Sequence, residues 1–311
     1  MKVLLAIDGS DASMSAVAAT AALDIPSGST VEIVSVIPDS FAPEGSVWPN
    51  VVPVDPPTDR ARIFDDVSRR LMEIGDRLRV DGRDVEVRVL DGRPATEIVA
   101  EAKRIEADLI VMGARGLSTV RRLLLGSVSS EVVDHATCPV LVARHAGTQR
   151  VLVATDGSPS ASDAVAFVAE SGTFEGAQIR IVSVADTGMP WWVGVSAVDG
   201  VSSIDSYAAE TTLAEERAGR VAGDAAVRLH DLNVVDITSK GDGDVVATIL
   251  REAAEWQADI IVLGARNRGT MHRWLAGSVS RSVLHLAGAS VLIVRPRAAV
   301  PAREAALTAA I

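Results

Sequence analysis

The chain has 311 residues, 48% of them apolar, which is enough for two ordinary domains with ample core. Its net charge of −11, with no basic run, argues against a nucleic-acid partner, and no apolar run reaches the ~18 residues that span a bilayer. The single cysteine, Cys138, excludes an internal disulfide, and Asp8 interrupts the first apolar run too early for a signal peptide, so we expect a cytoplasmic protein without membrane contact.

The first half of the chain begins with a buried strand, since residues 2–7 are a leucine and β-branched run. An Ala-rich helical pattern over 11–23 and a second strand at 31–37 follow. Residues 38–58 hold six prolines and no apolar period, which predicts a loop. An apolar stripe of helical period then predicts a helix over 59–80.

Strands and helices continue to alternate through the rest of this half. A strand is predicted at 85–90, a helix opened by a proline at 94–105, a strand at 108–113, a helix at 126–136 and a strand at 139–144. This alternation is typical of an α/β fold. We therefore predict a doubly wound, five-stranded parallel sheet in the order 3-2-1-4-5, with helices on both faces.

The second half repeats the first. KVLLAIDGSDASMSAV, from residue 2, matches RVLVATDGSPSASDAV, from residue 150, and ADLIVMGARG, from 107, matches ADIIVLGARN, from 258. We expect tandem domains over 1–145 and 149–297, packed together because the tether is short, and a flexible Ala-rich tail over 298–311. In the second half a Gly-, Ser- and Trp-containing loop over 186–205 replaces the proline-rich one.

A glycine-containing stretch occurs once in each half. Residues 113–127 read GARGLSTVRRLLLGS and residues 264–278 read GARNRGTMHRWLAGS. In the predicted sheet the first stretch begins where the strand order reverses, which is the usual ligand crevice. Glycine permits positive φ and close approach of a ligand, and the N-terminus of the next helix favours an anion. Glycine turns and serine caps also occur without a ligand, but the duplication at this point favours phosphate binding.

At this point a family resemblance becomes clear. The pattern G-x2-G-x9-G-[ST], at Gly113, Gly116, Gly126 and Ser127, resembles that of the ATP-binding branch of the universal stress protein family. AIDGS from residue 6, DGRPATEIV from residue 91 and CPVLVAR from residue 138 resemble the same family. The match covers nearly the whole chain in two copies, and the family fold agrees with the α/β sheet predicted above.

The resemblance implies one ATP per half, with Mg²⁺ carried by the phosphates. In the first half it implies nucleoside contacts from Ala6, Ile7, Asp8, Val36, Met112 and Gly113, and phosphate contacts from Arg115, Gly116, Gly126, Ser127, Val128 and Ser129. The matching positions in the second half are Ala154, Thr155, Asp156, Val184, Leu263, Gly264, Arg266, Asn267, Gly277, Ser278, Val279 and Ser280. Asn267 replaces Gly116, so we expect weaker binding there.

The sequence alone does not decide between a binding protein, an enzyme and a scaffold. The two aspartates that end the first strand of each half, Asp8 and Asp156, could bind a ligand or only the following turn. P-loop, G-x-S-x-G and dinucleotide motifs are missing, so we expect an ATP-binding stress regulator without catalytic residues. The alternatives are a slow ATPase or autophosphorylating enzyme, and a nucleotide-free scaffold. In the scaffold, the last strand of each half would pair with the other half or with a second chain in a homodimer.

Overall fold

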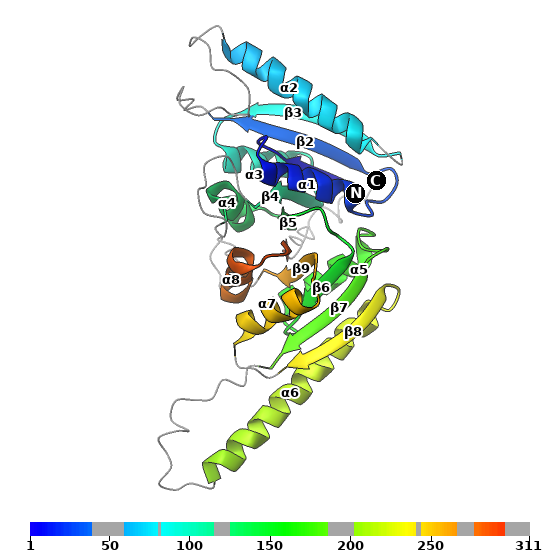
Figure 1. Ribbon diagram of the computed structural model, residues 1–311, viewed down its shortest axis with the longest axis vertical. Helices are drawn as coiled ribbons and strands as arrows, with labels where there is room; N and C mark the ends of the chain where they lie inside the picture. Colours follow the sequence, from blue (N-terminus) through cyan, green and yellow to red (C-terminus); the bar gives the residue numbers. More distant parts are fainter. Residues whose placement is uncertain are drawn as a thin grey trace, which may run out of the picture.

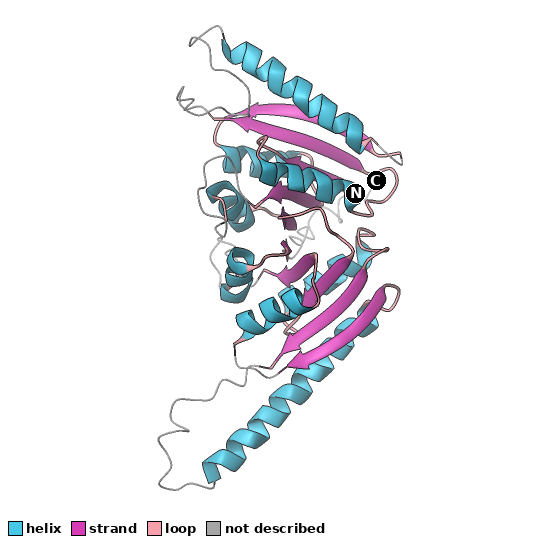
Figure 2. Ribbon diagram, viewed as in Figure 1, coloured by secondary structure: helices cyan, strands magenta, loops and turns pink. Residues whose placement is uncertain are grey.

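The computed structural model describes residues 1–38, 59–79, 82–114, 125–185, 202–240, 244–265 and 277–295. Its strands form one continuous sheet in the order β3-β2-β1-β4-β5-β10-β9-β6-β7-β8 (Figure 1). Each half therefore has the predicted order 3-2-1-4-5, and all pairs within a half are parallel. Helices cover both faces (Figure 2), which confirms the predicted fold class.

The helices and strands of the first half begin and end close to the predicted positions. They are β1 (Lys2–Ala6), α1 (Asp11–Ala22), β2 (Thr30–Ile37), α2 (Asp59–Leu78), β3 (Asp84–Asp91), α3 (Pro94–Arg104), β4 (Leu109–Gly113), α4 (Ser127–His135) and β5 (Val140–Ala143). The predicted loop at 38–58 lies outside the described residues apart from Pro38.

The second half has the same order of elements. They are β6 (Arg150–Ala154), α5 (Pro159–Glu170), β7 (Gln178–Val184), α6 (Ser202–Arg228), β8 (Asn233–Lys240), α7 (Val245–Glu255), β9 (Ile260–Gly264), α8 (Ser278–Leu286) and β10 (Ser290–Val294). α6 begins at Ser202, so residues 202–205 of the loop predicted over 186–205 are helical, and the rest of that loop lies outside the described residues. Serine is as typical of a helix N-terminus as of a loop, which explains the error. The tail at 298–311 lies outside the described residues.

Two apolar layers, one on each face of the sheet, form the core. Leu4 and Leu5 are adjacent on β1 and both fully buried, because successive strand side chains point to opposite faces. Leu5 packs in the layer under α1 and α2, and Leu4 in the layer under α3 and α4. Both layers continue into the second half. No helix in the described part of the chain is long and apolar enough to cross a bilayer.

The halves join through their last strands. β5 and β10 pair in antiparallel fashion, with Leu141 opposite Leu292. The two strands that the sequence offered as possible edges therefore pair with each other inside one chain. β3 and β8 are left at the two ends of the sheet, where α2 and α6 pack against them (Figure 1).

Candidate functional site

The strand order reverses between β1 and β4, as predicted. Ala6 at the end of β1 pairs with Met112 on β4 and with Val34 on β2. The amide of Ile7 still donates to the Val34 carbonyl, at 2.9 Å, which keeps the chain beside β2 for one more residue. Asp8 then follows at the carboxyl end of the sheet, where ligands bind in this class of fold.

The aspartates after β1 and β6 hold the turn that leads into the next helix. Asp8 Oδ1 accepts hydrogen bonds from the Ser10 amide at 3.0 Å and the Ser10 hydroxyl at 2.6 Å. Asp156 Oδ1 accepts one from the Ser158 amide at 2.9 Å. The turn role considered from the sequence is therefore present in both halves. A carboxylate has about four acceptor positions, so this contact is compatible with a ligand hydrogen bond.

The glycines that end β4 and β9 are needed for packing. A Cβ on Gly113 would lie 2.5 Å from the backbone carbonyl oxygen of Ala12, in the first turn of α1. A Cβ on Gly264 would collide with the backbone carbonyl of Ser160 on α5 in the same way. Neither glycine has a positive φ, so the freedom to adopt the left-handed region, which the sequence offered as one use of glycine, is not used at these two positions. Close packing of a helix explains them instead.

Ser129 and Ser280 tie a helix to a strand end. The buried hydroxyl of Ser129 donates to the Gly113 carbonyl at 2.9 Å, and Ser280 does the same to Gly264. A hydroxyl has a single proton to donate, and here it is used within the protein. A phosphate contact from either residue would therefore come from its backbone amide and not from its side chain.

The two helices that begin beside these strand ends have no side-chain cap. Their N-cap residues are Gly126 on α4 and Gly277 on α8, so Ser127 and Ser278 are the exposed first helical residues and not caps. Side chains of Ser10, Ser158 and Asp244 cap α1, α5 and α7, whereas α3 also has no side-chain cap. The first-turn amides of an α-helix have no partner within the helix. In α4 and α8 they are therefore available to an anion.

In the second half these elements surround a cavity of about 250 Å³. Ten of the twelve predicted positions line it, namely Ala154, Thr155, Asp156, Val184, Leu263, Gly264, Gly277, Ser278, Val279 and Ser280. The other two, Arg266 and Asn267, lie outside the described residues. Sequence reasoning missed Val245 and Ile249 of α7, which form an apolar wall of the cavity. The apolar stripe on this helix was the available signal.

The first half arranges its matching residues in the same way. Ala6 and Met112 belong to one buried cluster, and Val36 and Val128 pack against it half-buried. The amide of Gly126 donates to the Ala114 carbonyl at 2.8 Å, which places the start of α4 beside the end of β4. The predicted residues Arg115 and Gly116 lie outside the described residues.

The arrangement suits a ligand with a flat, weakly polar part and an anionic part. The second-half cavity has aliphatic side chains from β7, β9 and α7, and hydroxyls and a carboxylate at its polar side. Its volume is slightly below the ~300–1,000 Å³ of typical small-molecule pockets. Within the described ranges no cluster of three or more His, Cys, Asp or Glu side chains could hold a metal ion.

The fold and the cleft define a tandem doubly wound α/β protein, with a candidate small-molecule site at the switch point of each half. The family model described as "Universal stress protein family" matches residues 1–144 and again 147–295. The chain thus belongs to the universal stress protein family, as two tandem copies, which confirms the family that its motifs indicated.

Relatives and solved structures agree with this assignment. The chain is 31% identical over 204 residues to a universal stress protein of Mycobacterium tuberculosis, a match that covers 61% of this chain and 62% of that protein. It is 33% identical over 147 residues to one from Bacillus subtilis, covering 46% of this chain and 98% of the relative. A crystal structure of a universal stress protein from Archaeoglobus fulgidus has the same fold, with a TM-score of 0.62, 22% identity, and 96% and 98% of the two chains covered.

Proposed function

We propose that this protein is a nucleotide-binding regulator that binds one ATP in each half, with Mg²⁺ carried by the phosphate oxygens. The observation that supports it most is the second-half cavity, because ten predicted ATP positions from four separate segments of sequence line one space. Membership of the universal stress protein family supports the same reading for the whole chain.

The ligand would lie along the strand ends. The adenine would pack against Val184 and the α7 residues Val245 and Ile249, which are apolar. Asp156 would accept a hydrogen bond from the ribose. The phosphates would lead to the uncapped start of α8, where free amides and the helix dipole favour negative charge. Few carboxylates line the cleft, so Mg²⁺ would be held mainly by the phosphates.

Calorimetric titration of the full chain with ATP and Mg²⁺ tests this proposal. We expect two sites in the unmodified protein and one in each of the variants Gly126→Val and Gly277→Val, since a side chain at the N-cap blocks approach to the first-turn amides. Gly288→Ala is the matched control, because a Cβ there meets no atom within 4 Å. Two sites of unchanged affinity in all three variants would rule out the proposed phosphate position.

The enzyme alternative is tested by turnover. A slow ATPase would need a base at the cleft, and the aspartates that follow β1 and β6 are the candidates. We expect no difference in phosphate release between the unmodified protein and the double variant Asp8→Asn, Asp156→Asn. A loss of release in the variant would instead identify an enzyme.

Self-association through the last strands is the scaffold alternative. Because β5 and β10 pair within the chain, a homodimer would have to use another surface, such as the outer strands β3 and β8. Sedimentation with and without ATP measures whether a dimer forms and whether nucleotide controls it.

A further inference from the structure

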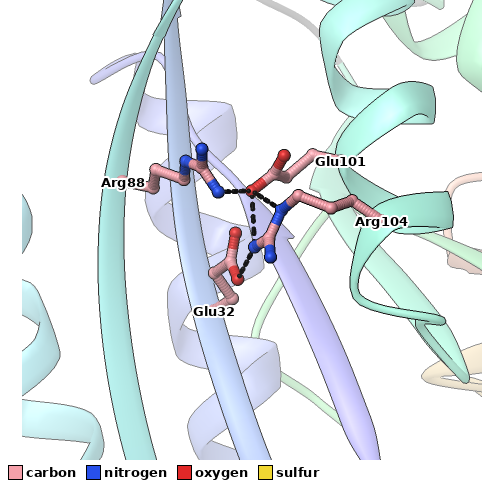
Figure 3. A network of polar contacts seen from close by, with 4 residues as sticks. All are labelled: Glu32, Arg88, Glu101 and Arg104. Atoms are coloured by element: carbon pink, nitrogen blue, oxygen red, sulfur yellow. Dashed lines mark hydrogen bonds and ion pairs between the residues drawn. The ribbon is translucent and has the colours of Figure 1, made fainter.

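A group of four charged side chains, two buried carboxylates and two arginines that reach the surface, lies between the sheet and α3, outside the proposed ATP site. It consists of Glu32 on β2, Arg88 on β3, and Glu101 and Arg104 on α3 (Figure 3). Glu32 is 3% exposed and Glu101 is 5% exposed. Two carboxyl groups are thus placed together out of water, which is costly unless each is well paired.

The two carboxyl groups are not equally supported. Glu101 Oε1 accepts hydrogen bonds from Arg88 Nη1 at 2.9 Å and from Arg104 Nε and Nη2 at 2.9 and 2.8 Å. Glu32 Oε2 accepts one from the same Arg104 Nη2, at 2.9 Å. Glu32 Oε1 is buried and has no hydrogen-bond partner among the described residues. An ionised Glu32 would therefore leave one charged oxygen unsatisfied.

The other groups around Glu32 do not relieve this imbalance. Its strand neighbours are the apolar Leu4 on β1 and the exposed Glu86 on β3, and neither side chain offers it a hydrogen-bond donor. Lys2, at the start of β1, lies 4.0 Å from Glu106 in an exposed ion pair.

Of the two carboxyl groups, Glu32 therefore binds a proton more tightly than Glu101 does. Burial, together with the neighbouring Glu101 carboxyl, raises the pKa of Glu32 to about 7. Burial opposes ionisation of Glu101 as well, but the hydrogen bonds from Arg104 and the charge of Arg88 hold the pKa of its carboxyl below the ordinary value. A protonated Glu32 can donate to the anionic Glu101, whereas an ionised one repels it.

We propose that Glu32 is a proton-operated latch that sets how firmly α3 is held against the sheet in the first half. With the proton on, a hydrogen bond between the two carboxyl groups joins β2 to α3. With the proton released to solvent, two buried carboxylates face each other with Arg104 shared between them, and the docking of α3 weakens. The only covalent bond that is made or broken is the O–H bond of the Glu32 carboxyl.

The second half has the opposite charge at this position and provides an internal control. Arg180 on β7 takes the place of Glu32, and Glu252 on α7 takes the place of Glu101. Arg180 Nη1 lies 3.7 Å from Glu252 Oε2, Nη2 lies 3.2 Å from Asp236 Oδ2, and its guanidinium stacks 4.9 Å from the centre of the Trp256 ring. Strand and helix here attract each other across neutral pH, so α7 has no such latch.

Amide hydrogen exchange of the full chain at pH 6 and pH 8, corrected for intrinsic rates, tests the latch. If the pKa of the Glu32 carboxyl returns to its ordinary value of 4.5 when α3 opens, the equilibrium constant for opening of α3 rises about tenfold between pH 6 and pH 8. We expect that increase in α3 and no comparable increase in α7. Equal pH dependence of the two helices, or none in α3, would overturn the proposal.

Two variants assign the effect to one side chain. Glu32→Gln keeps the shape and a donor but does not ionise, so α3 exchange should lose its pH dependence. Glu86→Gln removes the neighbouring exposed carboxyl and should leave the pH dependence intact. Carbon-13 NMR of labelled glutamate carboxyls gives a second readout, since one resonance should titrate near neutral pH and vanish in Glu32→Gln. A pH-dependent α3 in Glu32→Gln would refute the latch.

Discussion

Arg144, just past β5, donates from Nη2 to the backbone carbonyl of Leu284 on α8, at 2.6 Å. Arg295, just past β10, donates to the carbonyl of Val133 on α4, so the contact is made in both directions. Each half thus binds a helix of the other with the residue that follows its last strand. We predict that Arg295→Ala lowers the free energy of unfolding by about 1–3 kcal/mol, the usual cost of removing a charged hydrogen-bond donor from a buried carbonyl.

Urea unfolding measures this loss. The control is Arg217→Ala, at an exposed position on α6, which should change the stability by less than about 0.5 kcal/mol. Equal effects of the two substitutions would show that the reciprocal contact contributes nothing to stability.

A second prediction concerns Gly113. An added methyl group would lie 2.5 Å from the Ala12 carbonyl oxygen, so Gly113→Ala must displace the first turn of α1. We expect a loss of about 1–3 kcal/mol in the free energy of unfolding without any ligand present, as for other overpacked sites. Gly288→Ala is again the control, and unfolding of the ligand-free protein is the measurement. If Gly113→Ala is as stable as the unmodified protein, packing does not require this glycine, and close approach of a ligand becomes the better explanation for it.

The third prediction separates the nucleoside side of the first site from its phosphate side. Asp8→Ala should weaken ATP binding in the first half by about 1–3 kcal/mol, because a charged acceptor is lost. Binding of inorganic triphosphate should be spared, since Asp8 follows β1 while the phosphates are proposed to lie at α4. Calorimetry in the Gly277→Val background isolates the first site. Asp8→Asn keeps an oxygen for the Ser10 contacts and controls for the turn. Equal losses for both ligands would contradict this placement.

The stability of the protein should also depend on pH through Glu32. Its pKa is about 7 in the folded state against 4.5 as the ordinary value, so the folded protein binds this proton more tightly than the unfolded chain does. The stabilisation is fully present below pH 4.5 and is lost as pH rises through 7. We predict that, as pH rises from 5 to 8, the free energy of unfolding of Glu32→Gln increases relative to that of the unmodified protein. Thermal unfolding of both proteins across this range checks the sign, and a constant difference would contradict it.

The fifth prediction is that the second half binds ATP more weakly than the first. Asn267 stands where the first half has Gly116, and Asp156 is exposed whereas Asp8 is half-buried. A tenfold difference in affinity would correspond to about 1.4 kcal/mol, within what one side-chain contact can change. Titration of Gly126→Val and Gly277→Val, each with one remaining site, makes the comparison. A tighter second site would indicate that Asn267 itself contacts the ligand.

The sequence was a good guide wherever the information was local or repeated. Apolar runs and helical stripes placed the strands and helices, and the duplicated glycines located the cleft. The sequence was a poor guide where tertiary packing decides what a residue does. Gly113 is required by α1, about a hundred residues away in sequence, and the Ser129 hydroxyl is taken by a strand carbonyl. The buried Glu32 went unnoticed, although comparing it with Arg180 in the repeat would have shown opposite charges at one core position.

The β5–β10 pairing fixes the stoichiometry of the two halves. Two separate chains associate according to their concentration, and identical chains form identical partners. Here the partner is always present, at one to one, however dilute the protein. The two halves are therefore free to differ, as they do in carrying Glu32 against Arg180 and Gly116 against Asn267. A single molecule can in this way combine a pH-responsive half with an unresponsive one, an asymmetry that a symmetric dimer of one short chain cannot have.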